Sequence, residues 1–126
     1  AYAEVVKQTE VQGRSFLEAE QAILGVNHAQ VGGRLLERWE FPQDLVAAVC
    51  HHHDPQAAAP HEVLAAGVHL ADMLAHLLGY SYGHHSLAVR AQTDALRLWE
   101  LNAHDVEQLL LETQMAVDQV SLLKPV

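Results

Sequence analysis

Three consecutive histidines, followed by an acid and a proline, constrain this chain more than any other feature. Residues 49–55 have the sequence VCHHHDP, and a run of imidazoles beside a helix-breaking proline is hard to explain as core packing. His28 lies upstream of this run and Asp72 lies downstream, each in a separate segment with helical periodicity. Imidazole suits zinc, iron and nickel ions, whereas carboxylate suits harder ions. These residues therefore predict a divalent-metal site of the kind that acts on phosphate esters.

The composition predicts one folded domain. Half of the 126 residues are hydrophobic, which is enough to bury a core. The longest apolar runs are too short to cross a bilayer and no secretory signal precedes the fold, so we expect a cytoplasmic protein with no membrane partner. The single cysteine, Cys50, excludes an internal disulfide and fits a reducing compartment.

The charge argues against nucleic acid as a partner. Seven basic residues stand against sixteen acidic ones, which gives a formal net charge of −9 with the ten histidines neutral. Binding to a phosphate backbone depends on neutralisation by lysine and arginine. We therefore expect no direct binding of DNA or RNA.

The hydrophobic periodicity is helical nearly throughout, with no alternation typical of strands, and it predicts an all-α bundle. Capping signals at Ser15 and Asn27 mark two helix starts, and Gly13, Gly25 and Gly79 mark helix ends. The predicted helices cover residues 2–12, 15–25, 27–39, 42–53, 61–79, 93–99 and 102–120, with a loop over residues 80–92. Apolar residues follow three-four spacing in the third helix (Val31, Leu35 and Trp39), and the fourth helix is expected to bury Leu45, Val46 and Val49. The last helix has a stripe of Val106, Leu110, Thr113, Val117 and Val120, which we expect to add a surface for association.

Each candidate ligand also has a structural interpretation. His28 could be a half-buried histidine that bonds a neighbouring carbonyl, and Asp72 could be a buried acid bonded to a histidine or to helix N-terminal amides. His52 and His53 point about 100° apart on a helix, so only one can aim at a shared metal unless the helix ends there. The other would then bond an acid or a substrate phosphate.

In the order of its motifs, the chain resembles the later part of an HDOD domain, the HD-related output domain of bacterial signalling proteins. HDOD domains are related to the HD and HD-GYP phosphohydrolases. The resemblance is close over residues 15–80 and looser in the flanks, and its motifs are residues 17–25, 27–32, 35–39, 41–42, 48–49, 52–55 and 69–72.

The resemblance implies an HD-domain-like helical bundle over residues 1–126, without the N-terminal part of a full HDOD domain, and a role in bacterial signal transduction. Carried over onto this sequence, it makes four residues candidate metal ligands: His28, His52, His53 and Asp72. It implies a divalent transition metal as the candidate cofactor and no other cofactor. The expected partners are signalling protein domains, together with either a second copy of the chain or the missing N-terminal segment.

One element of the metal-dependent relatives is missing. Their sites include a His-Asp doublet on an earlier helix, and no such doublet precedes His28 in this sequence. The doublet His104-Asp105 falls after Asp72, outside the motif order, and the Gly-Tyr-Pro signature of the HD-GYP branch does not follow Asp54. A hydrolytic metal centre needs its full ligand count. We therefore expect a non-catalytic signalling module, and keep a metal-dependent phosphohydrolase acting on a nucleotide or cyclic dinucleotide as the alternative.

Overall fold

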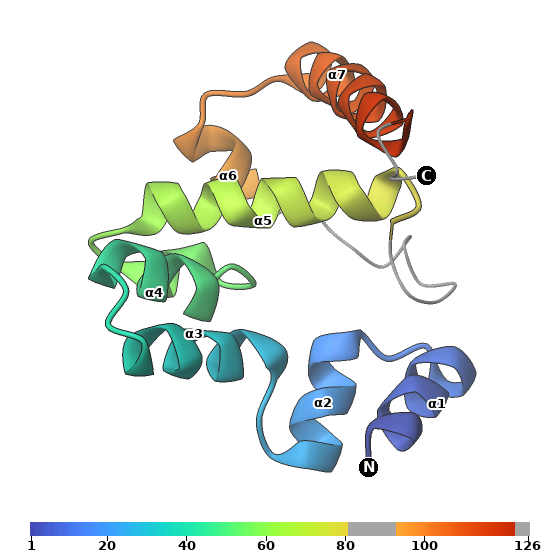
Figure 1. Ribbon diagram of the computed structural model, residues 1–126, viewed down its shortest axis with the longest axis vertical. Helices are drawn as coiled ribbons and strands as arrows, with labels where there is room; N and C mark the ends of the chain where they lie inside the picture. The colour runs from blue at the N-terminus through green and yellow to red at the C-terminus, as the bar shows by residue number, and fades with distance from the viewer. Residues whose placement is uncertain (81–92, 123–126) are drawn as a thin grey trace.

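The computed structural model describes residues 1–80 and 93–122, and within these residues all regular secondary structure is helical, which confirms the predicted all-α fold (Figure 1). The predicted loop from residue 80 to residue 92 lies, apart from Tyr80, outside this range. The elements are α1 (Tyr2–Gln12), α2 (Phe16–Leu24), α3 (His28–Arg38), α4 (Gln43–Cys50), the 3₁₀ helix η1 (Pro55–Ala58), α5 (Glu62–Leu77), α6 (Thr93–Leu98) and α7 (Ala103–Leu122). None of the described helices is both long and apolar enough to span a membrane.

The capping signals of the sequence set the helix boundaries as predicted. Ser15 and Asn27 each form a complete capping box at the start of α2 and α3, so their side chains satisfy backbone amides that have no partner in the first turn. Gly13 ends α1 at φ 64° and Gly25 ends α2 at φ 73°. This left-handed conformation costs glycine little because it has no Cβ.

The fourth helix is shorter than predicted. It ends at Cys50, and His51, His52 and His53 form a turn that leads into η1. The expected connector after Asp54 therefore contains a 3₁₀ turn, and the histidines lie beyond the helix end.

The α3–α4 hairpin packs through small residues. Ala29 and Gly33 of α3 are buried against α4, where Ala48 is 1 % exposed. A Cβ placed on Gly33 would lie 2.7 Å from the Cβ of Cys50, so the two backbones are too close for a larger side chain. This packing brings the N-terminus of α3 close to the end of α4.

The apolar residues of the third helix face outward, although their spacing is typical of a buried helix face. Val31, Leu35 and Trp39 are 52 %, 42 % and 60 % exposed and lie outside the hairpin. The close approach at Gly33 explains the difference, because it leaves room on the inner face only for alanine and glycine and turns the larger side chains outward. All three of the α4 residues were predicted to be buried. Val46 and Val49 are half-buried, whereas Leu45 is 39 % exposed.

The central helix α5 lies between the α3–α4 hairpin and the two C-terminal helices (Figure 1). Four of its buried side chains form a core cluster with Ala95 of α6: Ala66, Leu70, Met73 and Leu74. Trp99, which follows α6, is held on α5 by a hydrogen bond from its indole N–H to the carbonyl of Val63 at 2.8 Å.

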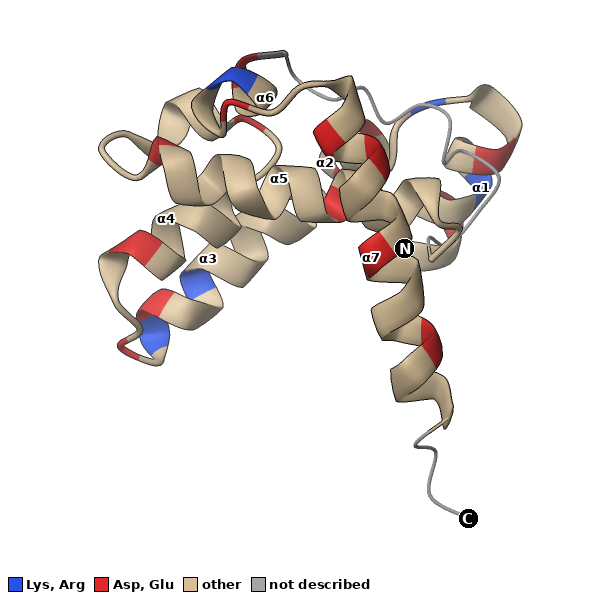
Figure 2. Cartoon of the chain, turned by 90° about the horizontal axis from the view of Figure 1, so that it is seen from above, with Lys and Arg blue, Asp and Glu red and all other residues tan. Residues whose placement is uncertain are grey.

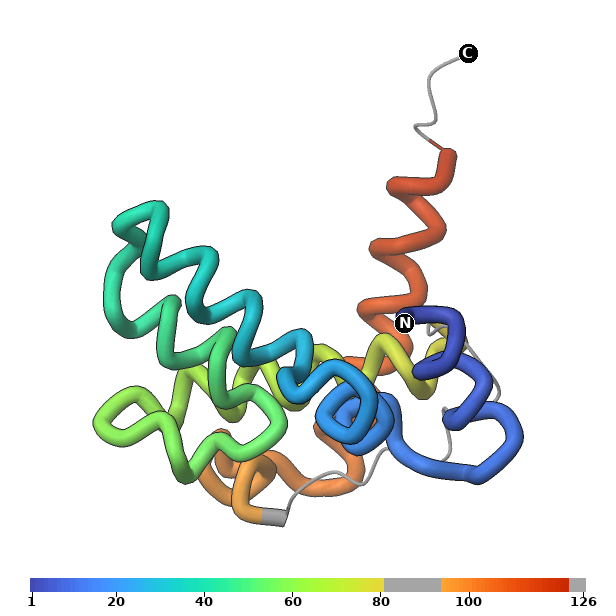
Figure 3. Tube along the Cα trace, turned by 90° about the horizontal axis from the view of Figure 1, so that it is seen from below, coloured from blue at the N-terminus to red at the C-terminus, as the bar shows by residue number. Residues whose placement is uncertain are grey.

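The last helix packs on this core only near its beginning. Val106, Leu109 and Leu110 contact the cluster, whereas Val120 is 67 % exposed, so the predicted stripe is covered only at its N-terminal end. The second half of α7 extends away from the rest of the chain (Figures 2 and 3). Its C-terminal turns therefore have no neighbouring helix in the described part of the chain to bury them.

The α3–α4 contact gives a stability prediction. Replacing Gly33 with alanine removes a flexible glycine from a helix, a gain of up to about 1 kcal/mol, but it forces Cβ against the backbone and Cβ of Cys50. Overpacking of this kind costs about 1–3 kcal/mol, so we expect Gly33→Ala to lower the free energy of unfolding by roughly 1 kcal/mol in urea denaturation. The control Glu37→Ala, on the exposed side of α3, should stay within about 0.5 kcal/mol of the parent chain. A Gly33→Ala variant more stable than the parent would show that the hairpin can open at no cost.

Candidate metal centre

Three histidines from two distant segments converge beside the α3–α4 hairpin. His28 is the first residue of α3, and His52 and His53 lie in the turn after α4. One ring nitrogen from each histidine lies within 4.8 Å of the other two. The closest pair is the Nε2 atoms of His28 and His53, 2.8 Å apart. The structure therefore brings His28 together with both His52 and His53, but it does not place Asp72 in the same group of ligand atoms.

The end of α4 explains how adjacent residues can share one site. Because α4 stops at Cys50, the backbone at His52 and His53 is no longer helical, and their ring centroids lie only 4.0 Å apart. The predicted condition for both to face one site is thus met.

A buried carboxylate that the sequence analysis missed orients His28. Glu20 of α2 is 2 % exposed, and its Oε2 accepts from the backbone N–H of His28 at 2.9 Å and from the ring Nδ1 at 2.6 Å. With Nδ1 bonded to Glu20, the lone pair of His28 Nε2 faces the other two histidines. This arrangement of carboxylate, histidine and open nitrogen is the usual support of a histidine metal ligand.

The signal for Glu20 was present in the sequence. Glu20 lies four residues after Phe16 and three before Ile23, which places a carboxylate on the apolar side of a short helix. A charge at such a position needs a partner, because an unpaired buried carboxylate is costly. The partner is eight residues away, across the turn between two helices, so the spacing alone did not identify it.

Two backbone carbonyls hold the other side of the cluster. His52 donates from Nδ1 to the carbonyl of Val49 at 2.7 Å, which leaves its Nε2 as the nitrogen that can accept a metal. The buried His69 of α5 donates from Nδ1 to the carbonyl of His52 at 2.9 Å. His69 therefore fixes the turn that carries the histidine pair.

The environment favours neutral imidazoles. Burial lowers the pKa of His53 to about 3, with further lowering from His52 and His28. Burial also lowers the pKa of His52, although its bond to Val49 opposes this shift. A neutral imidazole has the free lone pair that a metal needs, so the cluster is ready to bind a cation near neutral pH.

Asp72 lies beside this cluster rather than within it. Its carboxylate is 3.3 Å from Nδ1 of His76, one turn further along α5, and its side chain is 33 % exposed. The carboxylate is close enough to raise the pKa of His52, but it does not belong to the group of ligand atoms within 4.8 Å. The predicted alternative of a buried acid bonded to a histidine therefore holds for the histidine partner but not for the burial. The role of Asp72 as a metal ligand stays a prediction.

The three imidazoles fit a small divalent ion. Metal–nitrogen bonds of about 2.0–2.1 Å in a tetrahedral site separate two ligand nitrogens by roughly 3.3 Å. The 2.8 Å contact between His28 and His53 is a hydrogen bond between ring nitrogens, and a metal would take the place of the shared proton. A bound ion would supply positive charge and an open coordination position at this spot.

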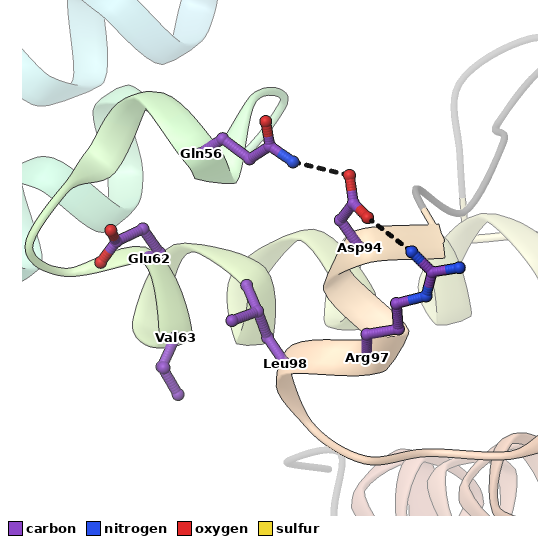
Figure 4. Close-up of a pocket in the computed structure, with 6 residues that line it drawn as sticks. All are labelled: Gln56, Glu62, Val63, Asp94, Arg97 and Leu98. Carbon is purple, nitrogen blue, oxygen red and sulfur yellow. Dashed lines mark hydrogen bonds and ion pairs between the residues drawn. The ribbon is translucent and has the colours of Figure 1, made fainter.

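A separate pocket lies where η1, α5 and α6 meet, and it does not share residues with the histidine cluster. Its polar groups bond one another: Gln56 donates to Asp94 at 2.6 Å, and Asp94 pairs with Arg97 at 3.4 Å (Figure 4). These groups hold η1 and α6 together, and we assign no ligand to them.

The fold and the cluster define an all-helical domain with a three-histidine centre between α3 and the end of α4. The sequence model of the HDOD domain family matches residues 1–55, a segment that includes all three histidines and Glu20. The suspected HDOD resemblance is thereby confirmed for this segment, while the Asp72 motif lies beyond the match. No curated protein and no solved structure matches the chain.

The buried carboxylate gives the second prediction. Glu20→Ala leaves two donors of His28 without their acceptor, and we expect a loss of about 1–3 kcal/mol in the free energy of unfolding, measured by chemical denaturation. The matched variant Glu20→Gln keeps an acceptor oxygen of the same size, so its loss should be clearly smaller. Equal losses in the two variants would show that the charge of Glu20, and not its position as an acceptor, holds His28.

The lowered pKa of His53 gives a prediction on pH. Above pH 6.5 the imidazole is neutral in both the folded and the unfolded chain and contributes nothing to the pH dependence. As the pH falls from 6.5 towards the folded value of about 3, the unfolded chain takes up a proton that the folded chain does not, so stability falls. We expect the metal-free His53→Gln variant to lose less stability than the parent chain between pH 6.5 and 4, in denaturation series at each pH.

A direct measurement of His53 accompanies this series. Nitrogen-15 NMR of metal-free protein should show the ring still neutral at pH 4.5, well below the ordinary histidine pKa of about 6.5. A His53 ring that titrates near pH 6.5 would contradict the burial of this imidazole.

Proposed function

We propose that the chain is a non-catalytic regulatory module of bacterial signal transduction that acts by binding other proteins. In this proposal His28, His52 and His53 hold a divalent metal as a structural element. The HDOD match over residues 1–55 supports the family context. The metal role rests on the three-imidazole cluster itself.

One observation carries the non-catalytic part of the proposal. Among the described residues, the group of side chains close enough to share an ion contains three imidazoles and no carboxylate. Glu20 is engaged on the far nitrogen of His28, and Asp72 is paired with His76. A centre with two metals needs ligands that the ions share, so these three nitrogens support at most one ion.

The positions of the arginines in residues 1–80 and 93–122 give further support. Phosphate substrates are usually bound by arginine or lysine beside the metal. Arg14 donates a hydrogen bond to Gln8, and Arg97 pairs with Asp94. Neither of these partners belongs to the histidine cluster. Arg34 and Arg38 lie on the exposed face of α3. A metal at the cluster would then act by linking the start of α3 to the turn after α4.

The alternative is a metal-dependent phosphohydrolase acting on a nucleotide or cyclic dinucleotide. Three histidines with an open position are a ligand set that hydrolytic zinc sites also use, and the carboxylate of Asp72 lies near enough to affect His52. The metal would then polarise a phosphoryl oxygen and lower the pKa of water. The ligand group of three imidazoles without a carboxylate favours the first function.

The experiment that tests the proposal measures binding and turnover on the same samples. Protein purified without a histidine tag is titrated with Zn²⁺, Ni²⁺ or Mn²⁺ by calorimetry, and loaded samples are incubated with cyclic dinucleotides and an aryl phosphodiester. We expect one ion per chain and only background turnover. His53→Ala should weaken binding at least tenfold, a loss of about 1.4 kcal/mol, because it removes one of three ligands.

The control is His104→Ala, which removes an exposed histidine of α7 and should bind metal as the parent chain does. Absence of binding to the parent chain would refute the metal role. Robust turnover that is lost in Asp72→Ala would overturn the non-catalytic function and establish the phosphohydrolase.

A further inference from the structure

The exposed face of α3 combines apolar and basic side chains. Val31, Arg34, Leu35 and Arg38 are all exposed. Arg34 and Leu35 lie three and four residues after Val31, and Arg38 lies three and four residues after them, so the four side chains form a single stripe on the outer side of the helix. Trp39, 60 % exposed, continues this stripe at the helix end. We refer to these five residues as the α3 stripe.

The free face of α7 combines apolar and acidic side chains. Leu111, Met115 and Leu122 are 61 %, 64 % and 86 % exposed. With the exposed Asp118 between them, they follow the same spacing of three and four residues along the helix. Glu107, one turn before Leu111, is also exposed. We refer to these five residues as the α7 stripe.

The two stripes carry opposite charge in a chain that is otherwise acidic. Helix α3 has two arginines against one glutamate, and it is the only helix in residues 1–80 and 93–122 whose formal charge is positive. Helix α7 has four acidic residues and no basic one. The basic bands on α3 and the acidic bands on α7 lie on separate parts of the molecule (Figure 2).

From these surfaces we propose that the chain binds a second copy of itself, with the α7 stripe of one copy on the α3 stripe of the other. A contact between two α7 stripes would bring acids against acids, and a contact between two α3 stripes would bring arginines against arginines. Only the pairing of unlike stripes buries the exposed leucine, methionine and tryptophan side chains and also matches the charges.

The dimensions of the two stripes are compatible with such a contact. The α7 stripe covers residues 107–122, and the second half of α7 projects from the molecule (Figure 3), so a second copy can approach it. At about 1.5 Å per residue the stripe is roughly 24 Å long. The α3 stripe covers residues 31–39, and the exposed Phe41 and Leu45 extend the apolar surface beyond it.

This inference deepens the proposed function, since it rests on the chain's being a protein-binding module and names the partner. It does not use the histidine cluster, so the metal and turnover measurements can fail while self-association holds, and the reverse. Because the two stripes differ, each copy has both halves of the contact, and association can continue beyond two copies or close into a ring.

The test uses paired charge reversals and sedimentation velocity of the full chain, from low micromolar to several hundred micromolar. The α3 variant is Arg34→Glu with Arg38→Glu, and the α7 variant is Glu107→Arg with Asp118→Arg. We expect the parent chain to associate as its concentration rises, and each variant alone to associate at least about tenfold more weakly. An equimolar mixture of the two variants should regain association, because the reversed stripes again carry opposite charge.

Controls with the same change in net charge exclude a general effect. Lys7→Glu with Arg14→Glu matches the α3 variant, and Glu4→Arg with Glu10→Arg matches the α7 variant; all four positions are exposed. Both controls should associate as the parent chain does. A parent chain that stays monomeric throughout the range would overturn the proposal. So would a mixture that fails to regain association. Loss of association in the α7 variant but not in the α3 variant would also overturn it, because the α3 stripe would then take no part in the contact.

Discussion

The close contact between α3 and α4 is the constraint on which the rest of the structure depends. Gly33 lets the two backbones approach until a Cβ at this position would meet Cys50 at 2.7 Å. At this distance the start of α3 reaches the turn that follows α4, and His28 comes within hydrogen-bond distance of His53. A wider hairpin would separate the same histidines and remove the site. The packing of a glycine and two alanines therefore decides whether the imidazoles can share an ion.

Side chains from two other helices support the cluster. Glu20 of α2 turns the ring of His28, and His69 of α5 holds the carbonyl of His52. These bonds use Nδ1 of His28 and the backbone of the turn, so the ring nitrogens that face the cluster remain available. Burial and the mutual repulsion of the imidazoles keep His53 uncharged. The result is a preorganised set of neutral nitrogen donors. Because folding already orders each ring, metal binding loses less conformational entropy.

A hairpin built on small residues also determines the surface. When alanine and glycine occupy the inner face of α3, the larger apolar residues of the helix lie outside, among them Val31 and Trp39. Helix α7 has a similar imbalance, because only its first half contacts the core cluster. Apolar side chains that the chain does not bury itself favour contact with another protein surface. The close packing of α3 on α4 thus produces both the histidine centre and the exposed α3 stripe. The α7 stripe is exposed because α7 contacts the core only with its first half.

The sequence by itself determined the helical fold and most helix boundaries, because capping boxes at Ser15 and Asn27 and the glycines after α1 and α2 act locally. It also singled out His28, His52 and His53, which the structure brings together. It did not determine which face of α3 is buried, because the periodicity of Val31 and Leu35 is the same whether a helix packs through large or small residues. Only the tertiary structure decided that face, the early end of α4, the partnership of Glu20 with His28, and the position of Asp72 beside the cluster. Each of these depends on how closely segments far apart in the sequence approach one another, a distance that spacing along a helix does not contain.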